Sequence, residues 1–303
     1  MKIVDTTTYY KEDLMLDLRF NILDKYVDHF VVCEAKFSHS GQKKELFFNI
    51  KNFEKFKKKI IYLVVENEPD SINNNHNNET SVLRNNSVQR INFQRDFIKQ
   101  SLNLFSPDDF ILHSDNDEIP QLQNINFDKL NNEMIIFSQK LFYYKFNLLL
   151  PNMNWYGTKG CKLKDLKSLS WLRNIKNKRY KFFRLDTFFS DTKYQNVKIV
   201  NEGGWHFSNI KNIDDLKEKY LNDENHAEFS KQMTLDKIKS DVSNWTIDYD
   251  HNADKRSSSK NKKVKLKKVD KNYLPDYINK HIYKYKSITT NNKLLIIKVV
   301  YTL

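Results

Sequence analysis

The predicted fold follows from one stretch of the chain, Phe110-Ile111-Leu112-His113-Ser114-Asp115-Asn116-Asp117-Glu118-Ile119-Pro120. It begins as a short apolar run and ends in three carboxylates within four residues, with a proline soon after them. An apolar run bounded in this way predicts a buried strand that carries the acids at its C-terminal end. Because ligands bind at that end of the strands in an open α/β sheet, the acids mark a candidate site.

Asp115 and Asp117 are separated by one residue, so in extended backbone their side chains point the same way. Two hard oxygen ligands side by side suit Mg²⁺ or Mn²⁺. The alternative interpretation is a solvated acidic turn that caps the next helix, since acids favour turns and helix starts. The strand before the acids and the proline after them keep both interpretations open.

The chain upstream predicts the opening unit of a nucleotide-binding α/β fold. Ile3-Val4-Asp5 predicts a first short strand, and residues 12–22 predict a helix with acids in its first turn. Residues 30–34 predict a second buried strand that ends at Glu34, and residues 60–65 predict a third.

Between the third strand and the acidic stretch we expect a loop and a helix. Residues 66–86 are crowded with asparagine, so they predict a surface loop, either an insertion or a lid over the site. The helix that begins at Ser87 carries Arg95 beside its apolar stripe. An arginine can bind carboxylate or phosphate with two hydrogen bonds, and the alternative for Arg95 is a surface salt bridge.

Aromatic residues stand out downstream of Pro120. Tyr143, Tyr144 and Trp155 are candidates for stacking on the apolar faces of a hexose, although strand alternation sends one of the two tyrosines into the core. The stretch Asn201-Glu202-Gly203-Gly204-Trp205-His206-Phe207-Ser208 follows another short predicted strand. Its glycine pair allows close backbone approach, and its histidine offers a metal nitrogen or a proton acceptor, or else a structural ring.

The segments 114–120 and 203–208, taken together, resemble glycosyltransferase family 17, and the resemblance extends from Asp5 to about Tyr285. It implies a GT-A fold, which is an α/β fold with a Rossmann-like mixed central sheet flanked by helices, here with a C-terminal helical extension. It also implies a nucleotide-sugar donor, a divalent metal and inversion at the anomeric carbon. UDP-N-acetylglucosamine is the first donor that it suggests, with a glycan or another hydroxyl compound as acceptor.

The resemblance implies roles for particular residues. Asp115 and Asp117, helped by His206, are expected to hold Mn²⁺ or Mg²⁺. Inversion requires a carboxylate that takes the proton of the acceptor hydroxyl, and we expect Glu202 to be that base. His206 is expected to be a second catalytic residue. The competitors for the role of base are Asp186, Glu118 and Glu228. The donor-binding candidates are Asp5, Glu34, His39, Gly41, Arg95 and Asp115, although Gly41 alternatively serves only as a turn residue. The candidates for binding the acceptor or the sugar are Trp155, Tyr144, Gly204 and Trp205.

The chain departs from the family pattern in places. Asn116 stands where the resemblance implies an apolar residue, and the asparagine-rich and lysine-rich stretches look like local additions. These departures leave the acceptor open. Two rival functions are a metal-dependent nuclease or phosphotransferase acting on nucleic acid and a non-catalytic carbohydrate-binding module, but neither accounts for Gly203-Gly204-Trp205-His206.

Composition bounds the domain organisation and the partners. The 303 residues, 39% of them hydrophobic, predict a catalytic domain over 1–250, a basic flexible segment over 251–272, and a C-terminal helix with a docking tail over 273–303. The 51 Lys plus Arg against 38 Asp plus Glu, a net charge of +13, favour anionic partners without an obligate nucleic acid. Lys255–Lys271 is either a solvated run or a contact for an anionic membrane surface or a phosphorylated acceptor.

Two further features concern the compartment. Cys33 and Cys161 form no disulfide framework and no metal-binding spacing. No signal-peptide pattern and no apolar run long enough for a membrane span stands in the sequence, so we expect a cytoplasmic protein.

Overall fold

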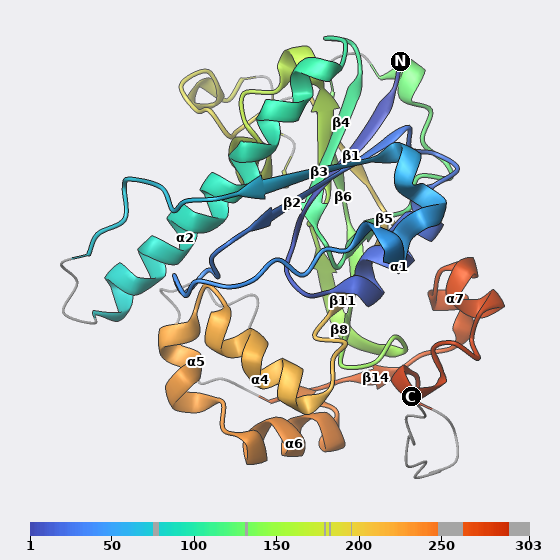
Figure 1. The fold of residues 1–303 in the computed structure, drawn as a ribbon. Coiled ribbons are helices and arrows are strands. Elements are labelled where there is room, and N and C mark those ends of the chain that lie inside the picture. The colour runs from blue at the N-terminus through green and yellow to red at the C-terminus, as the bar shows by residue number, and fades with distance from the viewer. Residues whose placement is uncertain are drawn as a thin grey trace.

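The computed structural model describes residues 1–74, 79–130, 133–178, 180–181, 183–194, 196–247 and 263–290 (Figure 1). Its main strands are β1 (Ile3–Tyr9), β2 (His29–Ala35), β3 (Ile60–Val65), β4 (Phe110–Asp115), β5 (Glu118–Pro120), β6 (Met134–Phe137), β7 (Gln139–Tyr143), β8 (Leu148–Trp155), β9 (Lys159–Lys162), β10 (Val197–Val200), β11 (Gly204–Ser208) and β14 (Lys267–Lys268). Its α-helices are α1 (Asp13–Leu23), α2 (Thr80–Phe97), α3 (Leu169–Asn174), α4 (Ile213–Asn222), α5 (His226–Gln232), α6 (Leu235–Asn244) and α7 (Asp276–Lys280).

The central sheet has seven strands in the order β10-β6-β9-β4-β1-β2-β3. The strands β4, β1, β2 and β3 run parallel to one another, while β9 runs antiparallel to both β4 and β6. The expectation of a mixed central sheet flanked by helices is therefore confirmed. The strands expected at residues 30–34, 60–65 and 110–114 correspond to β2, β3 and β4.

The apolar strands are buried because helices cover both faces of the central sheet. Phe110 and Leu112 join the core on the face of α1, whose buried side chains include Phe20. Ile111 joins the core on the opposite face, with Ile98. Alternate residues of one strand thus enter two cores, which explains the nearly continuous apolar runs in the sequence.

A second sheet, in the order β14-β8-β7-β11-β5, extends from the end of β4. Its pairing of β5 with β11 is antiparallel and sets Glu118 beside His206 and Pro120 beside Gly204. Gly204 has φ +127°, and a Cβ atom there would lie 2.2 Å from the carbonyl oxygen of Ile119, so a glycine is required. The two stretches that carry the family resemblance are therefore neighbouring strands.

Some expected boundaries differ from the observed ones. Helix α2 begins at Thr80, so the expected loop over residues 66–86 is too long, and residues 75–78 lie outside the described residues. Residues 251–262 of the expected basic segment and residues 291–303 of the expected docking tail also lie outside them, as do residues 248–250. Within the described ranges no helix combines the length and the apolar character needed to cross a membrane. Cys33 and Cys161 are both buried, free thiols.

Candidate functional site

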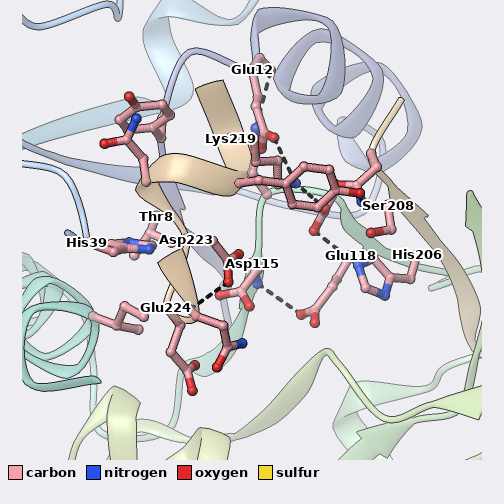
Figure 2. Close-up of a pocket in the computed structure, with 18 of the residues that line it drawn as sticks. Thr8, Glu12, His39, Asp115, Glu118, His206, Ser208, Lys219, Asp223 and Glu224 are labelled. Carbon is pink, nitrogen blue, oxygen red and sulfur yellow. Dashed lines mark hydrogen bonds and ion pairs between the residues drawn. The ribbon is translucent and has the colours of Figure 1, made fainter. Parts of the chain in front are cut away.

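A cavity of about 520 Å³ opens at the carboxyl ends of β1 and β4, and helices α2, α3 and α4 and the second sheet contribute to its walls (Figure 2). It brings together most of the residues that the sequence suggested for metal, donor and sugar binding. Those that line it are His39, Arg95, Asp115, Asp117, Tyr144, Trp155 and His206. This placement agrees with the rule that open α/β sheets bind ligands at this edge.

Asp115, at the end of β4, is held by two arginines. Arg95 Nη2 lies 2.8 Å from Asp115 Oδ1, and Arg173 Nη2 lies 3.0 Å from Oδ2. Burial raises the pKa of Asp115, but the two guanidinium groups outweigh it and hold that pKa well below its ordinary value. Asp115 is therefore an anion at neutral pH, and Arg95 pairs with it inside the cavity rather than forming a surface salt bridge.

Asp117 lies between a histidine and a lysine. His206 Nε2 is 3.4 Å from Asp117 Oδ1, and Lys219 Nζ is 3.5 Å from Oδ2. Burial raises the pKa of Asp117, but its interactions with His206, which include a hydrogen bond, and with the Lys219 ammonium outweigh it and lower that pKa below its ordinary value. Burial likewise opposes the charge of Lys219, yet Glu12 and Asp117 raise its pKa, so this lysine stays cationic.

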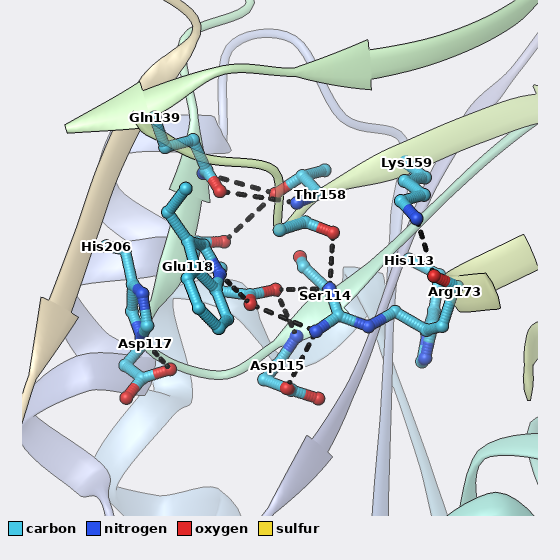
Figure 3. Close-up of polar contacts among 12 residues, drawn as sticks. His113, Ser114, Asp115, Asp117, Glu118, Gln139, Thr158, Lys159, Arg173 and His206 are labelled. Carbon is cyan, nitrogen blue, oxygen red and sulfur yellow. Dashed lines mark hydrogen bonds and ion pairs between the residues drawn. The ribbon is translucent and has the colours of Figure 1, made fainter. Parts of the chain in front are cut away.

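Glu118 is fully buried and its carboxylate is saturated with donors (Figure 3). It accepts hydrogen bonds from the Asp115 backbone N–H at 2.9 Å, from Trp155 Nε1 at 2.6 Å and from Arg173 Nη1 at 2.7 Å. A carboxylate with these partners positions its neighbours. Glu118 therefore ties Arg173 and Trp155 to the turn that carries Asp115.

Four cavity residues that the sequence analysis did not single out as site residues are Glu12, Arg173, Lys219 and Asp223. Arg173, on α3, bridges Asp115 and Glu118, and Lys219, on α4, bridges Asp117 and Glu12 at 3.3 Å. Their local sequences show ordinary helix patterns, and no local signal distinguishes them from solvated charges. Only Glu12 had a partial signal, because it stands at the start of the first predicted helix.

The structure corrects the role expected for Asp5. This residue is buried and does not line the cavity. Its oxygens accept hydrogen bonds from Arg19 Nε at 2.6 Å and from Arg19 Nη2 at 2.5 Å. Arg19 also donates to the Ser114 hydroxyl at 2.5 Å and to the Glu118 carbonyl at 2.8 Å. Asp5 thus anchors the arginine that supports the acidic turn, and it has no access to a nucleotide-sugar donor in the cavity.

Glu34 and Gly41 also serve the scaffold. Glu34 is buried outside the cavity, where it accepts hydrogen bonds from Lys44 Nζ and from the backbone N–H groups of Phe47 and Phe48. Gly41 adopts φ +92° in a turn beside Arg90, which agrees with the turn role rather than donor contact. His39 does line the cavity, and burial lowers its pKa to about 4, so its ring is neutral at pH 7.

Glu202, Gly204 and Trp205 line a different cavity, of about 380 Å³, so the roles expected for them at the main site need correction. Trp205 and His206 point to opposite faces of β11 because successive side chains of a strand alternate. The Glu202 carboxylate is 73% exposed and pairs with Lys140. This geometry argues against Glu202 as the base. The competitors Asp186 and Glu228 also lie outside the main cavity.

The aromatic candidates differ in access. Tyr143 and Tyr144 are both buried in the same apolar cluster, although both touch the cavity. Alternation does not separate them because Tyr144 leaves the strand with φ +62°. Trp155 is half-buried, and its ring centroid lies 4.8 Å from that of His206. Trp155 therefore presents an aromatic surface next to the acids, whereas the tyrosines are mainly core residues.

The carboxylate oxygens and the histidine nitrogen of this cavity are ligand types that Mg²⁺ and Mn²⁺ accept. In the part of the chain that the structure describes, however, no group of three or more His, Cys, Asp or Glu side chains is arranged to hold a metal ion. Asp115 faces two arginines and Asp117 faces His206 and Lys219. The acids are accordingly balanced by cations of the protein itself.

The chain matches the model of glycosyltransferase family 17 over residues 1–243. The chain therefore belongs to glycosyltransferase family 17, which confirms the expectation of a glycosyltransferase and speaks against the nuclease and binding-module alternatives. It is 27% identical over 194 residues to the β-1,4-mannosyl-glycoprotein 4-β-N-acetylglucosaminyltransferases of Rattus norvegicus and Homo sapiens. These matches cover 62% of this chain but only 35% of each relative.

Among solved structures, HddC from Yersinia pseudotuberculosis matches with 12% identity and a TM-score of 0.30, covering 67% of this chain and 92% of that chain. The same protein complexed with GMP-PN matches with 10% identity and a TM-score of 0.29, over the same shares of the two chains. A likeness at these values says nothing further about the present fold or its ligands.

Proposed function

We propose that this chain transfers a sugar from a nucleotide-sugar donor to a hydroxyl acceptor, with inversion at the anomeric carbon, on a GT-A type fold. The observation that carries the proposal is the cavity at the carboxyl ends of β1 and β4, where Asp115 and Asp117 lie among Arg95, Arg173 and Lys219. Fixed cations of this kind can hold a diphosphate and stabilise its charge as it leaves.

UDP-N-acetylglucosamine is the first donor to test, and a glycan the first acceptor. The support is the activity that names the rat and human relatives, the transfer of N-acetylglucosamine to mannosyl-glycoproteins. Trp155 is the residue of the cavity best placed to stack on a sugar, because it is half-buried and fixed by its hydrogen bond to Glu118.

The metal proposal rests on the same cavity. Asp115, Asp117 and His206 would hold Mn²⁺ or Mg²⁺, and a bound metal would neutralise the negative charge of the leaving diphosphate. Both carboxylates are ionised at neutral pH, which metal ligation requires. Because no group of three such side chains is arranged for a metal among the described residues, the proposal includes diphosphate oxygens as further ligands.

For the base we propose Asp223 in place of Glu202. Asp223 follows α4 and projects into the space that Asp115 also faces (Figure 2). The other carboxylates that line the cavity, Glu12, Asp115, Asp117, Glu118, Glu224 and Asp241, each pair with a lysine or an arginine.

Asp223 differs from them in its charge environment. Its Oδ1 accepts a hydrogen bond from the Asn225 backbone N–H at 3.0 Å, and no ion pair to it occurs among the described residues. Burial raises the pKa of Asp223 above its ordinary value, which makes this carboxylate a better proton acceptor than its paired neighbours. In the reaction, Asp223 takes the proton of the acceptor hydroxyl as that oxygen attacks C1 of the sugar.

The test is release of nucleoside diphosphate from a panel of nucleotide sugars, with Mn²⁺, with Mg²⁺ and with chelator. We expect release from one donor, abolished by chelator and in Asp117→Asn. Asp223→Asn should bind that donor normally but lose transfer by at least a hundredfold, as removal of a general base does. Glu202→Gln is the matched control, since it alters a carboxylate outside the cavity, and it should behave as wild type. Release unaffected in both Asp117→Asn and Asp223→Asn would refute the site.

A further inference from the structure

A second surface feature lies outside the cavity, in the segment that joins α3 to β10. Residues 183–189, the aromatic loop, carry four exposed large apolar side chains. Phe183 is 59% exposed, Leu185 is 72%, Phe188 is 71% and Phe189 is 91%. Such a cluster is unusual on a soluble surface and marks a contact with an apolar phase or a partner.

Positive charge surrounds the aromatic loop. Between residues 176 and 194 the sequence holds six Lys or Arg against two Asp. Both acids are neutralised, because Asp186 pairs with Arg184 and Lys193 at 2.7 Å each, and Asp191 pairs with Lys167 at 2.6 Å. Lys181 Nζ lies 5.6 Å from the Phe183 ring centroid, so a cation borders the apolar cluster directly. The loop therefore combines apolar tips with a basic rim.

The aromatic loop also stands apart from the catalytic cavity. In Figure 1 it projects from the end of the molecule opposite α4, α5 and α6, the helices on the cavity side. Apolar side chains at a loop tip surrounded by lysine and arginine match the two layers of an anionic bilayer surface, which are acyl chains beneath negative headgroups. A contact there leaves α4 and the cavity facing away from the surface.

We propose that the aromatic loop docks this protein on an anionic lipid bilayer, with Phe188 and Phe189 inserted below the headgroups. Lys181, which borders the Phe183 ring, then lies at headgroup level. The proposal is separate from sugar transfer, and it uses a different segment from the lysine-rich stretch at 255–271. A protein partner or a second copy of this chain is the competing occupant of such a surface, and the experiment distinguishes them.

The test is cosedimentation of the full chain with vesicles of phosphatidylcholine alone and of phosphatidylcholine with 30% phosphatidylserine, a composition chosen to bring the surface to roughly physiological negative potential. We expect binding to the anionic vesicles, weakened by raised salt and at least tenfold weaker in Phe188→Ser/Phe189→Ser. Ile282→Ser/Tyr283→Ser is the matched control, since it removes two other exposed apolar side chains next to α7 and should bind as wild type.

Further readouts keep the outcomes distinct. Because the chain already has four tryptophans, the readout is the emission of Phe189→Trp minus that of wild type, and this difference should shift to the blue with anionic vesicles if residue 189 inserts. Release of nucleoside diphosphate should stay unchanged in the Phe188→Ser/Phe189→Ser variant, so loss of vesicle binding is not loss of the fold. Equal vesicle binding by this variant and wild type would overturn the proposal. A second result would also overturn it: wild type self-associates but does not bind vesicles, and the variant does not self-associate. The loop would then be a contact between copies of this chain.

Discussion

The buried pair of Arg19 and Asp5 offers the sharpest test of how the site is built. Arg19 is fully buried, and its guanidinium bridges Asp5, the Ser114 hydroxyl and the Glu118 carbonyl. Its Nη1 also lies 3.3 Å from the Asp115 carbonyl. One side chain of α1 thus links β1 to the turn that presents the acids. We predict that Arg19→Met unfolds far more easily and loses activity even where it is folded.

The magnitude follows from what the substitution leaves behind. Methionine fills most of the volume, so packing changes little, but the Asp5 carboxylate stays buried without its partner. Breaking a buried ion pair on one side costs about 3–5 kcal/mol. For a domain of this size that loss lowers the melting temperature by roughly 6–20 °C.

A double variant separates the lost ion pair from the lost hydrogen bonds. Asp5→Leu/Arg19→Met removes both charges, so the uncompensated carboxylate disappears while the Ser114 and Glu118 groups still lack a donor. We expect it to recover about 1–3 kcal/mol relative to Arg19→Met, and the double-mutant cycle to give a coupling energy of about 2 kcal/mol or more.

The assay is urea unfolding followed by circular dichroism, with donor-dependent release of nucleoside diphosphate measured well below the melting temperature. Two results would contradict the reasoning. One is a decrease in the free energy of unfolding of less than about 1 kcal/mol in Arg19→Met, since a buried carboxylate would then have lost its partner with almost no loss of stability. The other is a coupling energy near zero, which would mean that the two side chains act independently.

Three further predictions concern the same site. Arg173→Lys should lower kcat/KM at least tenfold in steady-state assays, because one ammonium cannot bridge both Glu118 and Asp115. The pKa values of Asp115 and Asp117 are lower in the folded state than in the unfolded chain. Their contribution to stability is therefore present above the unfolded pKa of about 3.9 and is lost as the pH falls below it. The urea midpoint of unfolding should drop in that range, and it should drop less steeply in Asp117→Asn. Gly204→Ala should destabilise the fold by about 2 kcal/mol or more in thermal unfolding, since a Cβ would collide with the Ile119 carbonyl at φ +127°.

Much of the central sheet could be predicted from the sequence because its inner strands β2 and β4 are buried on both faces and its edge strand β3 is an apolar run that is partly buried. Such strands read as uninterrupted apolar runs, and residues 30–34, 60–65 and 110–114 became β2, β3 and β4. The common cavity of Asp115, Asp117 and His206 was also predictable, because each stands at a recognisable motif. The domain boundaries and the metal stay predictions.

Two of the misplaced residues, Asp5 and Glu34, share one physical cause. Asp5 and Glu34 stand on strands beside the site, and their role depends on whether a cation meets them from another element. Arg19 and Lys44 do so, and both acids are closed off from the cavity. Glu202 failed for a different reason. It was chosen for its proximity in sequence to the glycine pair Gly203-Gly204, but it lies exposed in the second cavity, paired with Lys140.

The sequence by itself determined the buried strands, the acidic turn at the end of β4 and the histidine motif that pairs with it. These features depend on local patterns of apolar and acidic residues, which the chain displays directly. Only the tertiary structure decided which charges meet. Arg173 reaches Asp115 across 58 positions, and Lys219 reaches Asp117 from α4. Such partners depend on sheet order, strand register and helix placement, and no local pattern records them.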